Sequence, residues 1–188
     1  MRRKIQNWLV FFTAVVIFNF SCKKDEDADT MVQTSSFSSE VVTTWLNRQL
    51  EMLRVPLPAG VGSQAAERCQ AYCGIAVYES VVPGMEAYRS LTGQLTDFPA
   101  MPTVEPGVDY HWAASANAAL AEMNRRLFPS TSAENKASID KLEDSLKAVY
   151  AGEVDAAILQ RSISFGKEVA TKVFAWAASD GSANVNPP

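Results

Sequence analysis

Apolar residues recur at spacings of three and four along most of the chain, in stretches that prolines and glycines separate. A period near 3.6 residues is typical of helices that bury one face, and no run alternates apolar and polar residues over the length of a strand. The sequence therefore predicts an all-α fold. We expect about five helices in an antiparallel array, with a Pro/Gly-rich irregular segment between the second and third long helices.

Prolines, glycines and capping residues suggest where the expected helices begin and end. They lie near residues 39–54, 63–82, 110–128, 132–150 and 154–178. Asp109 is the expected N-cap of the third helix, and Ser130 and Thr131 are expected to open the fourth. The second helix carries mostly small side chains, so we expect it to be central and mostly buried. Between 83 and 108 we expect at most one short helix, near 86–91.

The first residues have the organisation of an export signal. Arg2, Arg3 and Lys4 precede an uncharged stretch, Trp8–Phe20, which is shorter than the about 20 apolar residues that span a bilayer. The cysteine that follows resembles that of a bacterial lipobox, in which the Cys22 thiol receives a diacylglycerol. The Ser-Cys-Lys-Lys-Asp-Glu string around it resembles lipoproteins of the Bacteroidetes group. The alternatives are an ordinary secretory signal and an uncleaved anchor.

This leader sets the expected domain organisation and location. Residues 1–21 are predicted to be a lipoprotein signal peptide, residues 22–38 a flexible acidic tether and residues 39–188 a helical domain. We expect an exported protein that its lipid holds at the cell envelope, on the outer membrane and exposed at the surface, because acyl chains anchor without a transmembrane helix. The formal charge of −4 argues against nucleic acid as a partner, because phosphate binding needs clustered Lys and Arg.

Few side chains are candidates for chemistry. His111, the single histidine, could be a general base, but no partner constellation is visible, so we expect a capping or packing role. Cys69 and Cys73 could form a metal pair or a disulfide. Two thiols without further ligands make a poor zinc site, and cysteines four apart on a helix lie near the edge of disulfide geometry. We therefore expect both to be small buried residues.

Carboxylates and aromatic residues give no stronger signal. Glu67, Glu79 and Glu86 could include an acid/base pair, although nothing in the sequence brings them together. Several aromatic residues at helical spacing are expected in the core rather than in a ligand site: Trp45, Trp112, Trp176, Tyr72 and Tyr78. The sequence thus assigns no catalytic, cofactor-binding or metal-ligating residue, and Cys22 is the one predicted modification site.

A set of short stretches in a fixed order carries a family resemblance. They are Val55–Pro58, Ala71–Met85, Tyr88–Leu95, Tyr110–Trp112, Ala116–Leu120, Phe174–Trp176 and Asp180–Gly181. Together they resemble the N-terminal helical half of bacterial vanadium-dependent haloperoxidase-like lipoproteins, which belong to the type-2 phosphatidic acid phosphatase superfamily. The resemblance covers about residues 40–188. It implies a helical fold and a lineage, because its motifs are packing motifs rather than catalytic ones.

The resemblance also implies which catalytic parts to look for. The family's active site cradles vanadate or phosphate with Lys and Arg and uses a histidine on the metal or phosphorus, through the patterns K-x6-R-P, P-S-G-H and S-R-x6-H. None of these occurs in this chain, which ends about where the family's catalytic half would begin. We therefore expect the N-terminal part of a haloperoxidase- or phosphatase-like lipoprotein, inactive alone.

Two partners follow from this expectation. The membrane would be contacted through the N-terminal lipid. Either a frameshift or truncation left the chain incomplete, or a catalytic half on another chain supplies the site for vanadate, since no cofactor is expected in this chain. The alternative is a free-standing helical surface lipoprotein that acts as a binding or structural module.

Overall fold

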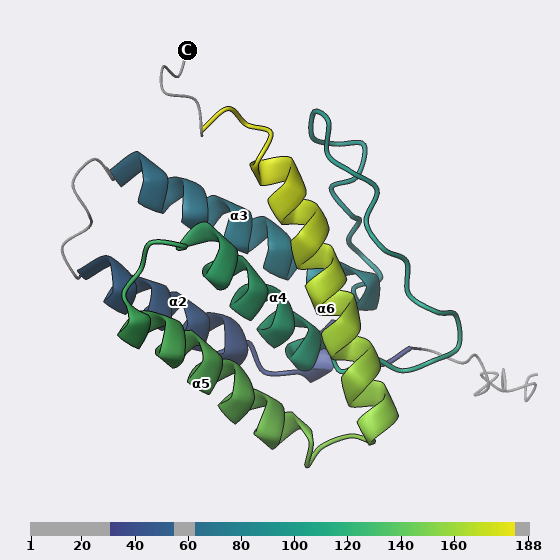
Figure 1. Ribbon diagram of the computed structural model, residues 1–188. Helices are drawn as coiled ribbons and strands as arrows, with labels where there is room; N and C mark the ends of the chain where they lie inside the picture. The colour runs from purple at the N-terminus through teal and green to yellow at the C-terminus, as the bar shows by residue number, and fades with distance from the viewer. Residues whose placement is uncertain (1–30, 55–62, 183–188) are drawn as a thin grey trace, which may run out of the picture. The chain divides into compact units, whose positions relative to one another are not determined.

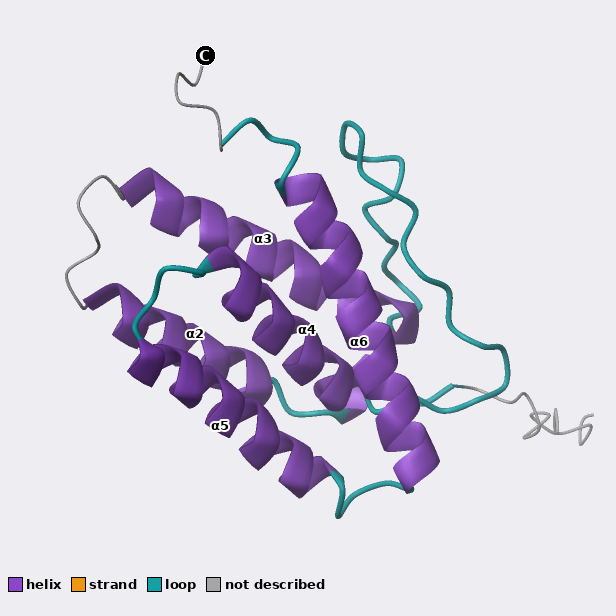
Figure 2. Ribbon diagram, viewed as in Figure 1, coloured by secondary structure: helices purple, strands orange, loops and turns teal. Residues whose placement is uncertain are grey.

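The computed structural model describes residues 31–54 and 63–182, and within these ranges the protein is built from helices alone (Figures 1 and 2). The elements are the 3₁₀ turns η2 (Thr34–Ser36) and η3 (Val82–Gly84) and the helices α2 (Glu40–Arg54), α3 (Ser63–Val81), α4 (Trp112–Leu127), α5 (Ala133–Tyr150) and α6 (Ala156–Ala177). The predicted all-α class is confirmed for this part of the chain.

Helix α4 lies at the centre of the fold (Figure 1). It packs against α2, α3, α5 and α6, and each of its residues from Trp112 to Ala121 is buried. The sequence predicts the second helix for this position, and that prediction is wrong. Helix α3 has Ala71 and Gly74 exposed to solvent, because its small side chains lie on its outer face as well as on its inner one.

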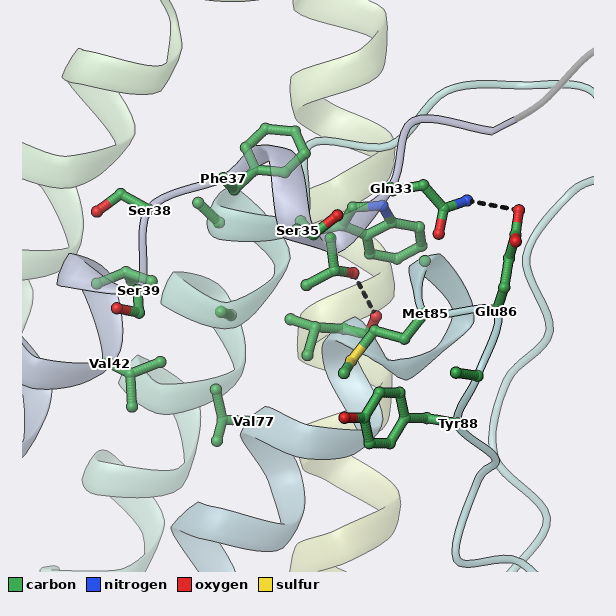
Figure 3. A pocket seen from close by; sticks show the side chains of 18 residues that line it. Gln33, Ser35, Phe37, Ser38, Ser39, Val42, Val77, Met85, Glu86 and Tyr88 are labelled. Atoms are coloured by element: carbon green, nitrogen blue, oxygen red, sulfur yellow. Dashed lines mark hydrogen bonds between the residues drawn. The ribbon is translucent and has the colours of Figure 1, made fainter.

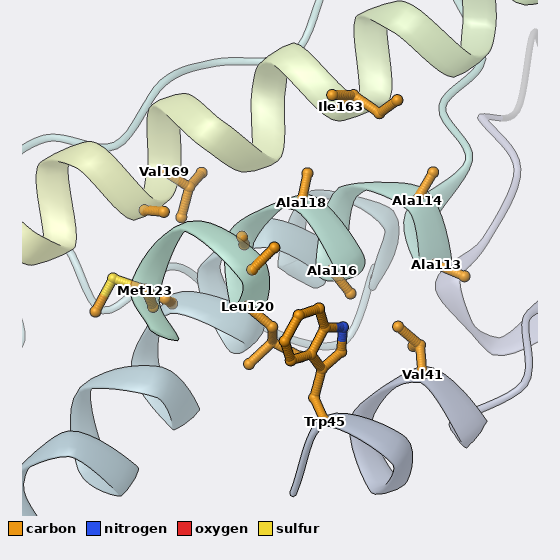
Figure 4. Close-up of a cluster of buried hydrophobic side chains, with 14 of the residues drawn as sticks. Val41, Trp45, Ala113, Ala114, Ala116, Ala118, Leu120, Met123, Ile163 and Val169 are labelled. Atoms are coloured by element: carbon orange, nitrogen blue, oxygen red, sulfur yellow. The ribbon is translucent and has the colours of Figure 1, made fainter. Parts of the chain in front are cut away.

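The core forms on two sides of α4 (Figure 4). On one side Ala114 and Ala118 face α6, whose Ile163 and Val169 belong to the same buried cluster. On the other side α2 contributes Trp45, which is fully buried. Alanines allow close packing of helices, so α4 can be enclosed by four neighbours only because its own side chains are short.

A buried amide joins three of these helices. The Trp45 indole Nε1 on α2 donates to the Asn117 Oδ1 on α4 over 2.8 Å. The Asn117 Nδ2 donates in turn to the backbone oxygen of Glu143 on α5 over 3.0 Å. Both ends of the amide are therefore satisfied where water cannot reach, as a stable core requires.

Two helices begin later than the sequence predicts. Helix α4 begins at Trp112 with His111 as its N-cap, and Asp109, the predicted cap, lies exposed in the preceding loop. Helix α5 begins at Ala133, where the Ser132 hydroxyl accepts from the Asn135 amide over 3.1 Å. The predicted openers, Ser130 and Thr131, lie two residues and one residue before the observed N-cap, Ser132.

The segment between η3 and α4 contains turns, bends and residues without regular secondary structure. The sequence predicts at most one short helix here, near 86–91, and the segment forms none, because its backbone groups bond to side chains of α3. The Glu79 carboxylate accepts from the Leu91 amide over 2.6 Å, and the Tyr78 hydroxyl donates to the Arg89 carbonyl over 2.7 Å. These two contacts fasten the loop to the end of α3.

Residues 31–38 pack against the helices, although the sequence assigns them to a flexible tether. The Trp112 indole Nε1 donates to the Val32 carbonyl over 2.6 Å, and the Phe37 ring meets the His111 ring edge-on with 4.6 Å between centroids. The folded part of the chain therefore includes this segment. Its composition is mostly polar, but its Phe37 is partly buried against the core.

The predicted signal peptide (1–21), the lipidation site Cys22 and the tether as far as residue 30 lie outside the described residues. Among the helices in the described part of the chain, none combines the length and the apolar character that crossing a membrane requires.

Candidate functional site

His111 is buried at the start of α4, with 1% of its surface exposed. Its Nδ1 accepts the backbone N–H of Ala114 over 3.0 Å, as a side-chain oxygen does at an ordinary N-cap. Its Nε2 lies 2.8 Å from the Oε2 of Glu153, whose side chain is half exposed. The hydrogen-bond network assigns the ring proton to Nε2, because Nδ1 must keep its lone pair for the cap.

Ser162, His111 and Glu153 together supply the residue types of a nucleophilic triad, but the geometry differs from one. The Ser162 hydroxyl accepts the backbone N–H of His111 over 2.8 Å and donates to the Ile158 carbonyl over 2.7 Å. A triad needs the hydroxyl on a ring nitrogen, and here both ring nitrogens are occupied. The arrangement therefore ties the start of α4 to α6, as the predicted capping and packing role requires.

Tyr150, at the end of α5, closes this cluster. Tyr150 is buried, and the centroid of its ring lies 4.7 Å from that of the His111 ring. Burial raises the pKa of Tyr150 to about 12, with smaller contributions from the carboxylates of Glu153 and Glu40. The phenol is thus neutral across the physiological range and acts as an apolar wall beside the imidazole.

Cys69 and Cys73 are both buried and free, as the sequence predicts for small core residues. Burial raises the pKa of the Cys73 thiol to about 12, against a smaller lowering by the Gln49 amide, and it also raises the pKa of Cys69. A thiol held protonated is a poor nucleophile and a poor metal ligand. Among the described residues, no group of three or more His, Cys, Asp or Glu is placed to hold a metal ion.

The three candidate carboxylates have separate environments. Glu67 is exposed on α3, and Glu86 is exposed in the following loop, where it accepts from the Gln33 side chain over 3.3 Å. Glu79 is buried, and one of its oxygens accepts from the Leu91 amide. Glu79 therefore holds the loop, and no contact between two of these carboxylates occurs in the described part.

The candidate aromatic residues serve packing, as predicted. Trp45 and Trp112 are fully buried, and the rings of Tyr72 and Phe98 each meet the Trp176 ring edge-on. The indole nitrogens of these three tryptophans donate to protein oxygens, so each polar edge is satisfied.

A hollow that the sequence analysis does not predict lies between α2, α3 and the N-terminal segment (Figure 3). It holds about 550 Å³. Val42 of α2 and Val77 of α3 form its walls, and Ala113 and Ala116 of α4 also line it. Its residues come from separate stretches of sequence, and valines and alanines at helical spacing are indistinguishable from core residues before the helices are assembled. No local signal identifies it.

The fold of this chain is similar to that of a protein of known structure. A crystal structure described as that of the first bacterial vanadium-dependent iodoperoxidase matches 77% of this chain, with 26% identity and a TM-score of 0.65. The chain has a haloperoxidase-like helical fold. The match covers 32% of the iodoperoxidase chain, so this chain spans about a third of that protein's length. No protein family matches the sequence, and none of the curated proteins compared with it does.

Proposed function

We propose that this chain is the N-terminal helical part of an exported lipoprotein of the vanadium haloperoxidase and phosphatidic acid phosphatase lineage, and that it is catalytically incompetent alone. The observation that carries the proposal is the likeness to the iodoperoxidase, which extends over most of this chain and about a third of that one. The sequence resemblance described above points to the same lineage independently.

The ligands offered by the part of the chain that the structure describes do not fit vanadate or phosphate. Such an oxyanion needs a free histidine nitrogen and cationic side chains directed at one point. Both ring nitrogens of His111 are bonded within the fold. Three arginines are already paired with carboxylates: Arg68 with Asp180, Arg125 with Asp140 and Glu143, and Arg126 with Glu122. These pairings support the proposal that the described residues do not form the oxyanion site.

Thermal unfolding with and without orthovanadate tests this proposal. A ligand that binds only the folded state raises the melting temperature progressively, with the logarithm of its concentration once that exceeds the Kd. We expect a cooperative transition that orthovanadate and phosphate leave unmoved. A dose-dependent rise would show an oxyanion site in this chain and would overturn the proposed incompetence. Addition of a second polypeptide that carries the K-x6-R-P and P-S-G-H patterns is the positive control. This polypeptide should bind the chain, and the complex should bind vanadate.

We further propose that the protein is anchored at the cell envelope through lipid on Cys22, on the outer membrane and at the surface. The basic start, the uncharged stretch and the position of the cysteine support this. Metabolic labelling with a radioactive fatty acid should label the chain, and the substitution Cys22→Ala should abolish the label and release the protein from membranes. A labelled Cys22→Ala chain would contradict the assignment.

The alternative function is that of a free-standing binding module, and the hollow between α2 and α3 favours it. The two functions differ in what stabilises the chain. A part of a larger enzyme should gain stability when its second half is added, whereas a module should gain stability from a small ligand alone.

A further inference from the structure

The hollow between α2 and α3 is a groove with a defined floor and walls. Helices α2 and α3 both pack on α4 but hardly touch each other, so a space stays open between them. Ala113 and Ala116 of α4 form its floor, and their methyl groups leave that space unfilled. Val42 on one side and Val77 on the other present apolar walls, as Figure 3 shows for the labelled valines.

The groove is bounded at its end by two segments. Phe37 and its neighbours cover one side, and Met85 and Tyr88 cover the other. The resulting volume of about 550 Å³ lies within the range of small-molecule sites. A helix with its side chains is about 10 Å across, so little more than one turn of a partner helix would fill the space. The dimensions therefore favour a small ligand over a docked helix.

The rim indicates the charge of that ligand. Ser38, Ser39 and Tyr88 are exposed polar residues at the opening, and among the described residues Glu86 is the one charged side chain that lines it. No lysine or arginine within residues 31–54 or 63–182 lines the groove. A carboxylate or phosphate head group would meet the negative charge of Glu86 with no cation to offset it, whereas hydroxyl groups can bond to the serines and the carboxylate.

We propose that this groove binds a single-chain lipid with an uncharged head group, such as a monoacylglycerol. The acyl chain lies against the valines and alanines, and the hydroxyl groups of the head lie at the rim beside Ser38 and Glu86. This inference does not depend on the haloperoxidase lineage, since it concerns a site that the proposed oxyanion chemistry does not use.

The experiment measures binding of the neutral apolar fluorophore 1-N-phenylnaphthylamine to the full chain carrying Cys22→Ala, so that no attached acyl chain competes. We expect saturable binding and displacement by monoolein at a concentration about tenfold lower than that of oleate, measured near pH 9, where oleate is ionised. Absence of saturable binding, or equal displacement by the two lipids, would overturn the proposal.

Two substitutions on the same helix locate the site. Val42→Glu places a charge on the groove wall and should weaken probe binding about tenfold or more. Leu50→Glu is the matched control, because Leu50 is on α2, is 46% exposed and does not line the groove. Circular dichroism shows whether each variant keeps its helices. Equal binding by both folded variants would contradict the assignment.

A third variant tests the head-group preference without touching the wall. Glu86 is exposed, so the Glu86→Gln variant should fold normally. It should reduce the preference for monoolein over oleate by about threefold or more. An unchanged preference would overturn the role of Glu86.

Two other occupants of the groove would give distinct results in the probe-binding experiment. A chain that forms dimers and excludes the probe would point to a second copy, and exclusion of the probe only when Cys22 is acylated would point to the protein's own lipid. Either result would overturn binding of a free lipid.

Discussion

Gly166 of α6 lies directly against the backbone of Ser115 on α4. A Cβ atom built on Gly166 would stand 2.9 Å from the Ser115 carbonyl carbon and 3.1 Å from its Cα, and it would overlap the carbonyl oxygen. Backbone atoms cannot move aside as a flexible side chain can. The glycine therefore sets how closely the two helices approach at the centre of the fold.

Gly166→Ala should lower the free energy of unfolding by about 1–3 kcal/mol, because α4 and α6 must separate to admit the methyl group. Gly74→Ala is the matched control, since no atom lies within 4 Å of a Cβ built there. It should raise stability by about 0.5–1 kcal/mol, as replacement of an exposed helical glycine does. Urea denaturation measures both. Equal effects of the two substitutions would contradict the close approach at Gly166.

His111→Ala should lower the free energy of unfolding by about 2–4 kcal/mol, because it removes the N-cap of α4 and leaves a cavity between Phe37 and Tyr150. Glu153→Gln should cost less than about 1 kcal/mol, since the Glu153 side chain is half exposed. Chemical denaturation at neutral pH gives both values. A His111→Ala variant that unfolded with the same free energy as the native protein would contradict the capping and packing role of His111.

Two buried amides should respond in opposite ways to apolar replacement. Gln49 is buried, and its amide has no hydrogen-bond partner apart from a weak interaction with the Cys73 thiol, so Gln49→Met should raise stability by about 1 kcal/mol. Asn117 bonds at both ends, to Trp45 and to Glu143, so Asn117→Leu should lower stability by about 1–3 kcal/mol. Calorimetry of the two variants checks the contrast, and a loss in both would mean that Gln49 has a partner.

Asp180 should make stability depend on pH. Burial alone would raise the pKa of this carboxyl, but the hydrogen bonds from Arg68, Ser182 and Tyr72 outweigh burial and hold its pKa well below the usual range. Because the folded pKa is the lower one, the contribution to stability is complete above the unfolded value, at about pH 4, and is lost as the pH falls further.

The comparison of native protein with Asp180→Asn tests this dependence. The variant should melt at a lower temperature than the native protein at pH 7, and the two melting temperatures should converge as the pH falls below about 4. Arg68 also donates to the Ala177 carbonyl over 2.6 Å, a bond that the substitution leaves in place. A difference in melting temperature that stayed constant with pH would refute the assignment.

The sequence by itself determined the helical class, the approximate helices and the burial of residues such as Trp45 and Cys73. These are local properties, because the spacing of apolar residues reports which face of a helix avoids water. The packing role of His111 was also predicted from the sequence, because no residues that could assist it as a general base are recognisable there. The family resemblance agreed with the fold that the comparison with the iodoperoxidase then supported.

Only the tertiary structure decided which helix is central, which residue caps α4 and where a ligand can enter. An alanine or glycine is equally compatible with a buried face and an exposed one, so α3 and α4 could not be ranked before they were packed. His111 became the cap because Glu153 and Ser162, far away in the chain, hold its ring and backbone in place. The groove exists because α2 and α3 both pack on α4 and make few contacts with each other, and such a relation between distant segments has no local signature.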